Sequence, residues 1–517
     1  MTTFLSRSQP LPGAAVLALA AGALNVFAFA PFGWWPLQVV TLAVLFHLVV
    51  EAATLRRAAL VGWLFGFGWT ACGVHWLYIS MHRYGGMAAP MAALAVALLA
   101  LYLGGYAALA SAIAVRFRQR RGTSSPQLLL VVLPAAWALC EWVRGWLFTG
   151  FPWVSTGYAH TASPLAGYAP LLGVYGVGWL AAVCAGALAL FARTRRVMPL
   201  CVIAAVLVAG LGLHRIAWTQ PNGQLISVRL LQGNVPQEMK FDPDQADRTL
   251  ALYEDMIRAA PADLIATPET ALPLLADQLP ADYLPRLSAF ATATNSHLAI
   301  GVPVSDGPGQ YANSMIGIAP ATARQGPQIY RYDKHHLVPF GEFIPYGFHW
   351  FVAMMRIPLG DFTRGAVLQA PFGVNGQWVM PNICYEDLFG EEIAEQLRHD
   401  AANGTPVPTI LLNMSNIAWF GDSIALPQHL QISQMRALET GRPMLRATNT
   451  GATAVIDPDG AVVTELKPFT RGVLTTAVQG YRGLTPYVRS GNAGIVLLAL
   501  VLLLTAWTRA RKTPDRR

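Results

Sequence analysis

Cys384 is the residue of this chain whose type and surroundings most strongly indicate covalent chemistry. It lies in a Pro-Asn-Ile-Cys-Tyr-Glu-Asp sequence at 381–387. The other cysteines lie in apolar runs long enough to span a membrane: Cys72, Cys140, Cys184 and Cys201. A lone thiol in a polar segment has no internal disulfide partner, so it is a buried filler, a residue without a role, or a nucleophile. The ionisable residues nearby favour the nucleophile.

Glu269 and Lys334 could supply the groups that such a nucleophile needs. A free thiol has a pKa of about 8.5, so little of it is thiolate at neutral pH. Glu269 could accept the thiol proton as a general base. Lys334 could favour the thiolate and stabilise the oxyanion that forms when a carbonyl is attacked, and the backbone N–H of Tyr385 is a natural second donor. Each residue alone is more often structural or solvated, so the prediction rests on their occurrence together.

Two further carboxylates and two histidines accompany these residues. We expect Glu342 and Glu386 to orient Lys334 or Cys384 rather than to react themselves. His335 and His336 have no metal-ligand spacing around them, so we interpret them as strand or supporting residues. The sequence therefore predicts neither a metal nor a cofactor.

The segment that carries these residues, 218–489, has the pattern of a layered α/β domain. Each of the three candidates lies at or just after a short β-rich run, which is where α/β sheets usually place catalytic groups. The β-rich runs are 226–232, 264–267, 298–304, 314–318, 379–384, 410–414 and 444–448. The helical stretches among them include 244–260, 282–294 and 425–440.

The rest of the chain is strongly apolar. The whole sequence is 54% hydrophobic and only 12% charged, with a mean hydropathy of +0.41, so much of it must lie in lipid. We expect seven spans before residue 218 and one after the domain, at 11–30, 34–54, 58–80, 86–115, 127–148, 166–192, 197–217 and 491–508. The first has no convincing cleavage site and is expected to be retained. The predicted domains are a membrane bundle (1–217), a catalytic domain (218–489), and a C-terminal span with a basic tail (490–517).

Charge placement predicts the orientation. Basic residues gather in alternate connections and in the tails, which the positive-inside rule places in the cytoplasm with both termini. Arg83 is the exception. Segment 218–489 then faces outward; it has 18 basic and 25 acidic residues, a formal charge of −7 against +15 for the remainder. The net charge of +8 thus reflects topology and not nucleic-acid binding. On the fifth span, Glu141 and Arg144 share a face, and we expect a structural pair that holds its outer end to the domain.

Several motifs together resemble a known family. Glu269, Lys334 and Cys384, in this order, resemble the catalytic set of the carbon–nitrogen hydrolase (nitrilase) superfamily. The flanking segments resemble the apolipoprotein N-acyltransferases in particular: 149–153, 232–237, 334–345, 413–423 and 436–443. This resemblance covers essentially the whole chain. It implies an extracytoplasmic αββα sandwich joined to a polytopic bundle of transmembrane helices.

The resemblance also implies a reaction. Cys384 would take an acyl chain from a membrane phospholipid as a thioester, and the α-amino group of a diacylglyceryl-modified N-terminal cysteine on an apolipoprotein would then accept it. The implied location is the bacterial inner membrane, multi-pass, with the catalytic domain in the periplasm. We expect a monomer without a cofactor.

Apolar residues near the candidate site predict contact with lipid. Segment 348–359 is unusually apolar for a soluble loop and could be a lid that enters the lipid or lines the acyl path, or could pack as ordinary core. Phe241 stands where the family is expected to have tryptophan. The residues predicted to bind substrate are Trp350, Phe351, Met354, Met355, Trp419, Phe420 and Phe241.

Two other functions remain open from the sequence. A membrane-anchored amidase or other hydrolase could use the same three residues with water as acceptor, and would lack a persistent thioester. A transporter or scaffold would keep its function when Cys384 is replaced. The apolar 348–359 segment favours lipid substrates, and the spans lack the series of buried charges that a transporter needs.

Overall fold

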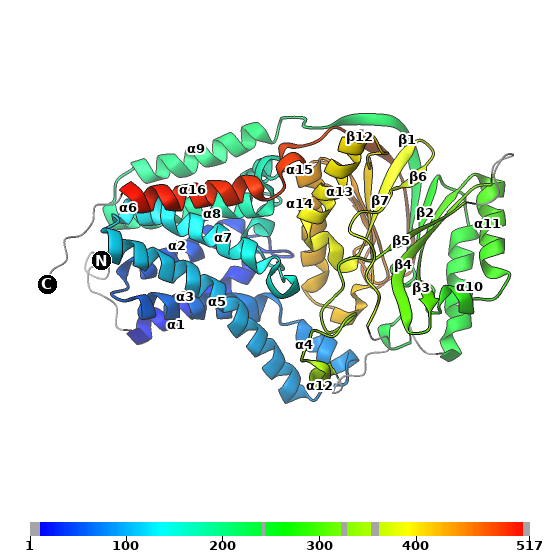
Figure 1. Ribbon diagram of the computed structural model, residues 1–517, viewed down its shortest axis with the longest axis horizontal. Coiled ribbons are helices and arrows are strands. Elements are labelled where there is room, and N and C mark those ends of the chain that lie inside the picture. Colours follow the sequence, from blue (N-terminus) through cyan, green and yellow to red (C-terminus); the bar gives the residue numbers. More distant parts are fainter. Residues whose placement is uncertain (1–10, 240–242, 322–327, 353–360, 510–517) are drawn as a thin grey trace. The chain divides into compact units, whose positions relative to one another are not determined.

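The computed structural model describes residues 11–239, 243–321, 328–352 and 361–509 (Figure 1). The chain divides into two compact units. One comprises Met1–Tyr78, Ala89–Ile216 and Ser490–Arg517. The other comprises Ile79–Ala88 and Ala217–Arg489.

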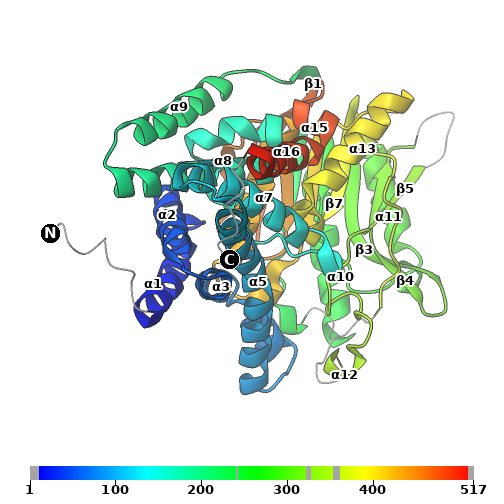
Figure 2. The ribbon, with the colours of Figure 1, turned by 60° about the vertical axis from the view of Figure 1, so that its left-hand side comes forward.

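The first unit is helical, and each predicted span overlaps one of its helices. The main helices are α1 (Leu11–Leu24), α2 (Trp35–Glu51), α3 (Leu55–Gly73), α5 (Ala89–Arg121), α7 (Leu133–Arg144), α8 (Ala169–Thr194), α9 (Met198–Leu213) and α16 (Ala493–Arg509). Helices α3 and α5 lie side by side, as the turned view in Figure 2 shows. Small residues permit this approach, since a Cβ on Gly66 would lie 2.7 Å from the Cα of Gly104.

The number of membrane spans is only partly supported. Within the described ranges, three helical segments are long and apolar enough to cross a membrane: Ala89–Arg121, Ser125–Arg144 and Pro164–Thr194. A fourth is possible if Leu55–Gly73 and Leu77–Tyr84, which meet at 60°, form one span. The remaining apolar helices are shorter, at 10–17 residues. The count of eight therefore stays a prediction.

Glu141 and Arg144 form a buried ion pair of 3.4 Å at the end of α7. Arg144 also donates hydrogen bonds to the carbonyl of Trp153 and to Ser155 Oγ, both at 2.9 Å. Glu141 Oε1 accepts the backbone N–H of Thr156 at 2.8 Å. The pair thus fixes the loop that follows α7 within its own unit, because each buried charge has a polar partner there.

The second unit contains two six-stranded sheets. The first has the order β12-β1-β2-β3-β4-β5 and the second β11-β10-β9-β8-β7-β6. The first set of strands is β1 (Gln220–Gln232), β2 (Leu264–Ala266), β3 (His297–Gly307), β4 (Gln310–Ala319), β5 (Gln328–Asp333) and β12 (Gly472–Arg482). The second set is β6 (Phe372–Val374), β7 (Gln377–Ile383), β8 (Ile410–Ser415), β9 (Met444–Thr448), β10 (Ala454–Ile456) and β11 (Val462–Glu465).

Helices cover the outer face of each sheet (Figure 1). Helices α10 (Pro243–Arg258) and α11 (Tyr283–Thr294) pack on the first sheet, and α13 (Gly390–Asn403) and α14 (Ala425–Thr440) on the second. On α10, Leu250, Tyr253 and Ile257 recur at helical spacing and are buried. A third apolar cluster, which includes Val228 and Leu412, joins the facing sides of the sheets. This arrangement confirms the two-sheet sandwich that the resemblance implied.

Segment Ile79–Ala88 belongs to this second unit although it lies between α3 and α5 in the sequence. Its ring contact joins Tyr84 to Trp419, with centroids 6.1 Å apart. Arg83 pairs with Glu238 at 3.1 Å. The ion pair with Glu238 gives a local reason for Arg83, the basic residue that departs from the charge pattern of the connections.

Candidate active site

Cys384 lies directly after β7, where the strand turns into the short 3-10 helix Cys384–Leu388. Its backbone φ is +53°, a value that residues other than glycine rarely adopt. Such backbone conformations are often found at functional sites. Burial raises the pKa of the Cys384 thiol, and the carboxylate of Glu269 raises it further, while Lys334 lowers it in part. A thiol with a raised pKa is mostly protonated at neutral pH, so a nucleophilic role for Cys384 would require a base.

Glu269 lies in the turn after β2 and is buried. Its Oε1 accepts hydrogen bonds from Lys334 Nζ at 3.1 Å and from Asn313 Nδ2 at 2.8 Å. Its Oε2 accepts the backbone N–H of Asn416 at 2.8 Å. A close approach of Gly301 beneath the turn helps to set this position, since a Cβ there would lie 2.1 Å from the carbonyl oxygen of Pro268.

Lys334 follows β5 and is 1% exposed. Its ammonium lies 3.1 Å from Glu269 and 2.8 Å from Glu342. Burial alone would lower the pKa of Lys334, but the two carboxylates outweigh it and raise that pKa. Lys334 is thus a permanent buried cation whose charge acts on the Cys384 thiol.

Glu342 is held by three donors. Its Oε1 accepts from Lys334 Nζ and Asn313 Nδ2, and its Oε2 accepts the backbone N–H of Val338 at 2.8 Å. Asn313 therefore bridges Glu342 and Glu269 through one amide nitrogen. Glu342 thus contacts Lys334 directly, at 2.8 Å, and its orienting role stays a prediction.

Glu386 connects the Cys384 turn to the segment after Lys334. Its Oε2 accepts the N–H of Ile383 at 2.6 Å and the hydroxyl of Tyr332 at 2.9 Å. Its Oε1 accepts the N–H groups of His335 and His336, at 2.6 and 3.1 Å. Burial raises the pKa of Glu386, although these donors favour its ionised form. Its side chain is fully used in joining two loops.

The neighbouring rings pack against one another. Tyr385 is buried, and its ring centroid lies 5.8 Å from that of His336. His336 stacks on Phe389 with centroids 3.4 Å apart, and its Nδ1 lies 2.8 Å from Glu392 Oε1. In the ranges that the structure describes, no group of three His, Cys, Asp or Glu side chains could hold a metal ion.

The predicted apolar residues are only partly within the described ranges. Trp350, on the short helix His349–Val352, is 64% exposed. Trp419 and Phe420 are half-buried in the turn Ile417–Phe420, directly after Asn416. Phe351 belongs to the short helix, but its side chain lies outside the description. Phe241, Met354 and Met355 lie outside the described residues altogether.

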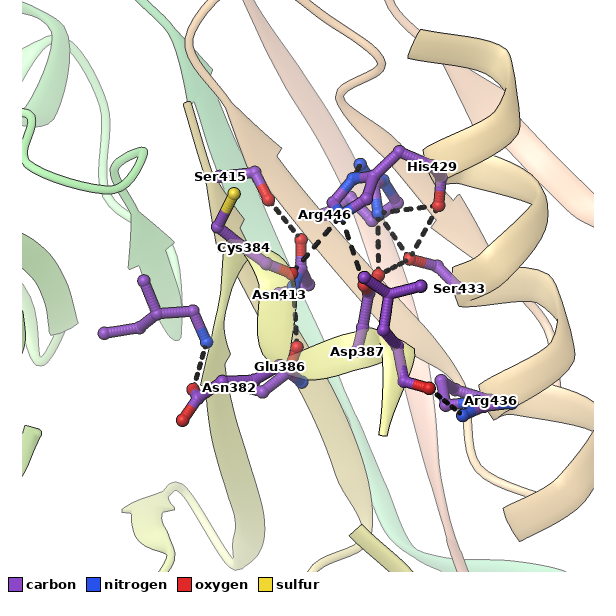
Figure 3. A network of polar contacts seen from close by, with 12 residues as sticks. Asn382, Cys384, Glu386, Asp387, Asn413, Ser415, His429, Ser433, Arg436 and Arg446 are labelled. Carbon is purple, nitrogen blue, oxygen red and sulfur yellow. Dashed lines mark hydrogen bonds and ion pairs between the residues drawn. The ribbon is translucent and has the colours of Figure 1, made fainter. Parts of the chain in front are cut away.

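Sequence reasoning missed the polar residues that hold the three candidates. Asn313 is a buried amide in the largely buried strand β4, and Asn416 lies in a motif that we noted without giving it a role. A buried network of Asp387, His429 and Arg446 lies behind Cys384 (Figure 3). A polar residue in a buried strand was the one available signal, but its partners Glu269 and Glu342 lie in loops 44 and 29 residues away in the sequence.

Comparison with known proteins now decides the family. Residues 21–187 match the apolipoprotein N-acyltransferase N-terminal domain, and residues 227–487 match the carbon-nitrogen hydrolase family. The apolipoprotein N-acyltransferase of Ralstonia nicotianae is 53% identical over 96% of this chain and 94% of its own. That of Nitrosomonas europaea is 44% identical over 96% and 98%. This chain belongs to the apolipoprotein N-acyltransferase family.

The family assignment agrees with the way its motifs meet in the structure. In the apolipoprotein N-acyltransferase motif 413–423, Asn416 Nδ2 donates to Gln237 Oε1 of motif 232–237 at 2.8 Å. The same residue binds Glu269 through its backbone. Among solved structures, an amidase from Nesterenkonia sp. is similar at 20% identity and a TM-score of 0.37, over 53% of this chain and 96% of that one.

Proposed function

We propose that the protein transfers an acyl chain from a membrane phospholipid to the α-amino group of the N-terminal diacylglyceryl-cysteine of an apolipoprotein, through a thioester on Cys384. The membership of the chain in the apolipoprotein N-acyltransferase family supports the substrate class. The observation that supports the mechanism is the buried ion pair of 3.1 Å between Glu269 and Lys334. Glu269, Lys334 and Cys384 each follow the end of a strand. Glu269, Lys334 and Cys384 are the proposed catalytic residues.

In the first half of the reaction, Glu269 accepts the thiol proton as Cys384 Sγ attacks the ester carbonyl of the phospholipid. The carbonyl oxygen becomes an oxyanion, which the Lys334 ammonium and the backbone N–H of Tyr385 stabilise. When the ester C–O bond breaks, Glu269 returns its proton to the leaving alkoxide. The products are a lysophospholipid and the acyl-thioester.

In the second half, the α-amino group of the acceptor attacks the thioester carbonyl. Glu269 accepts a proton from the amine, and the same two donors stabilise the second oxyanion. The C–S bond then breaks, the amide is released, and the proton returns to the Cys384 sulfur. One hard transfer is thereby divided into two easier steps.

We further propose that 1–217 is a bundle of seven spans, that 218–489 is a periplasmic domain, and that 490–517 returns the chain to the cytoplasm. Support comes from the alternation of basic connections and from the apolar helices. The enzyme would then be a multi-pass inner-membrane monomer with both termini in the cytoplasm. Alkaline phosphatase fused after residue 218 should be active, and fused after residue 195 inactive; the reverse pattern would reject this topology.

The segment around Trp350 is proposed to contact lipid. A ring that is 64% exposed does not pack as ordinary core, which favours the lid over the alternative for this residue. Trp419 and Phe420 follow Asn416 and are proposed to line the same apolar path. Phe351, Met354, Met355 and Phe241 are proposed members on sequence alone.

The test is intact mass spectrometry of the purified protein after incubation with phospholipid and no acceptor, beside Cys384→Ser. We expect a mass gain of one acyl chain that neutral hydroxylamine removes, that a lipopeptide discharges, and that Cys384→Ser lacks. Release of free fatty acid without an adduct would instead support the hydrolase. Absence of both, from folded protein, would reject the catalytic assignment.

A further inference from the structure

The backbone carbonyl of Cys384 accepts two hydrogen bonds from buried side chains (Figure 3). Asn413 Nδ2, on β8, donates to it at 3.1 Å. His429 Nε2, on α14, lies 3.2 Å from it. Both side chains are fully buried. A carbonyl oxygen can only accept, so the His429 contact requires a proton on Nε2.

The other ring nitrogen of His429 fixes that proton independently. Arg446 Nη2 lies 2.7 Å from His429 Nδ1, and a guanidinium can only donate. His429 Nδ1 is therefore the acceptor, and the proton of the neutral ring is on Nε2. This assignment follows from the hydrogen-bond network.

Asp387 completes the network. Its Oδ1 lies 3.1 Å from His429 Nε2, and its Oδ2 lies 3.2 Å from Arg446 Nη1 and also accepts from Ser433. Every partner of the imidazole that is drawn in Figure 3 is itself held by another buried group. The ring is therefore rigidly placed, and so is its Nε2–H, which faces both the Cys384 carbonyl and Asp387 Oδ1.

A planar trans peptide converts this contact into a constraint on catalysis. The carbonyl of Cys384 and the N–H of Tyr385 belong to one peptide plane and point in opposite directions. Two side chains that hold the carbonyl oxygen thus fix the direction of the N–H on the other side. That N–H is the donor which the proposed reaction uses at the oxyanion.

We propose that His429 and Asn413 are positioning residues that orient the Cys384–Tyr385 peptide so that the Tyr385 N–H meets the oxyanion in both half-reactions. The inference rests on the proposed function. Neither side chain touches substrate. Arg446 and Asp387 act one step further away, by selecting the tautomer and orientation of His429.

The experiment compares two reactions of the same sulfur. Thioester formation from phospholipid passes through an oxyanion, whereas alkylation by iodoacetamide displaces iodide at a saturated carbon and forms none. A residue that only orients the oxyanion donor should affect thioester formation and leave alkylation unchanged. Both rates are measured at one pH, with alkylation read from the mass of the proteolytic peptide that contains Cys384.

His429→Ala and Asn413→Ala should each slow thioester formation about 10- to 100-fold and change the Cys384 alkylation rate less than about twofold. His429→Gln keeps an N–H donor and should recover part of the loss. His399→Ala is the matched control, because that histidine is on α13, its ring pairs with Asp400 and not with the network, and its side chain is 42% exposed. The control should match the wild type in both reactions.

Equal losses in both reactions would overturn the inference, because they would show an effect on the thiol or on the fold. Unchanged thioester formation in both alanine variants would also overturn it. If His429→Ala does not fold, Asn413→Ala becomes the deciding variant. Among the contacts drawn in Figure 3, the Asn413 side chain does not contact Arg446. A wild-type protein that alkylates but takes up no acyl group would reject the proposed function first, and this inference with it.

Discussion

The ammonium of Lys334 lies closer to Glu342 than to Glu269, at 2.8 Å against 3.1 Å. One buried cation is thus shared by two carboxylates. A lysine paired with Glu269 alone would strongly favour the ionised carboxylate and make it a weak base. We expect the second carboxylate to offset this effect and to leave Glu269 able to accept a proton from the thiol, while Lys334 keeps its charge.

Glu342→Gln tests this balance. The amide keeps the shape of the side chain but removes the second negative charge, so Glu269 should become a weaker base. We expect thioester formation to slow by about tenfold or more, with little change in melting temperature. Glu395→Gln, on the surface of α13, serves as the control. Wild-type rates in Glu342→Gln would show that the shared cation has no catalytic consequence.

The raised pKa of Cys384 predicts the pH dependence of its alkylation. Since burial and Glu269 favour the neutral thiol, little thiolate is present at neutral pH, and the thiolate is the reactive form. The alkylation rate of Cys384 should be below that of free cysteine at about pH 7 and should still be rising at about pH 9. A plateau near or below pH 8 would mean that Lys334 dominates and that a thiolate is formed in advance.

Gly301→Ala should reveal how tightly the Glu269 turn is placed. The new methyl group would lie 2.1 Å from the Pro268 carbonyl oxygen and 2.8 Å from the Thr270 nitrogen, so backbone must move. A displacement of about 1 Å should slow acyl transfer roughly 100-fold. Gly472→Ala is the matched control, because its nearest neighbour is Leu466 at 3.4 Å, an ordinary contact. Near-normal activity in Gly301→Ala would show that the turn tolerates the shift.

The buried pair of Asp387 and Arg446 should contribute strongly to stability. Arg446→Leu leaves the carboxylate buried without its cation, which should cost about 3–5 kcal/mol in the free energy of unfolding. The double variant with Asp387→Asn should lose less than the sum of the single losses. Thermal or denaturant unfolding of the purified protein measures all three. A loss below about 1 kcal/mol in Arg446→Leu would contradict this reading.

Asp387 also predicts a loss of stability in acid. Burial would raise its pKa, but His429, Arg446 and Ser433 outweigh burial and lower it. Because the folded-state pKa is depressed, the stabilisation is present above the unfolded value of about 3.9 and is lost as the pH falls through the folded value. Asp387→Asn should weaken this acid dependence of the melting temperature. An unchanged profile would assign it to other carboxylates.

Trp350→Ala tests the proposed contact with lipid. Removing an exposed ring should leave the melting temperature and Cys384 alkylation unchanged, because the side chain is not core. The KM for phospholipid in vesicles should rise severalfold. Tyr346→Ala, which also removes an exposed ring, is the comparison. Equal effects of the two variants would indicate that exposed rings contact lipid in general and that Trp350 has no specific contact.

Much of this fold could be predicted because the strongest patterns are local. The seven predicted β-rich runs all coincide with strands, and the predicted helices with α10, α11 and α14. Strand β12 was missed because its stability comes from pairing with β1, about 250 residues away. The three-residue strands β6 and β10 are too short to carry a periodic signal.

The residues of the candidate site differ in how far the sequence could indicate them. Glu269 and Cys384 could be selected because they lie at the ends of predicted β-rich runs. Lys334 follows β5, which was not among those runs, and was selected for its residue type. Asn313 and His429 could not, since an amide or an imidazole in a buried element shows no partner in the sequence. Their roles depend on hydrogen bonds that exist only after two sheets and a helix have packed together.

The chain passes between its two compact units four times, after residues 78, 88, 216 and 489. A water-soluble fragment that contains only residues 217–489, between the last two crossings, would therefore lack ten residues of the folded unit, Ile79–Ala88. Trp419 would lose the ring of Tyr84 and Glu238 its arginine. Such a fragment would expose an aromatic surface beside the turn that carries Asn416, so a peptide of residues 79–88 supplied separately should improve its solubility.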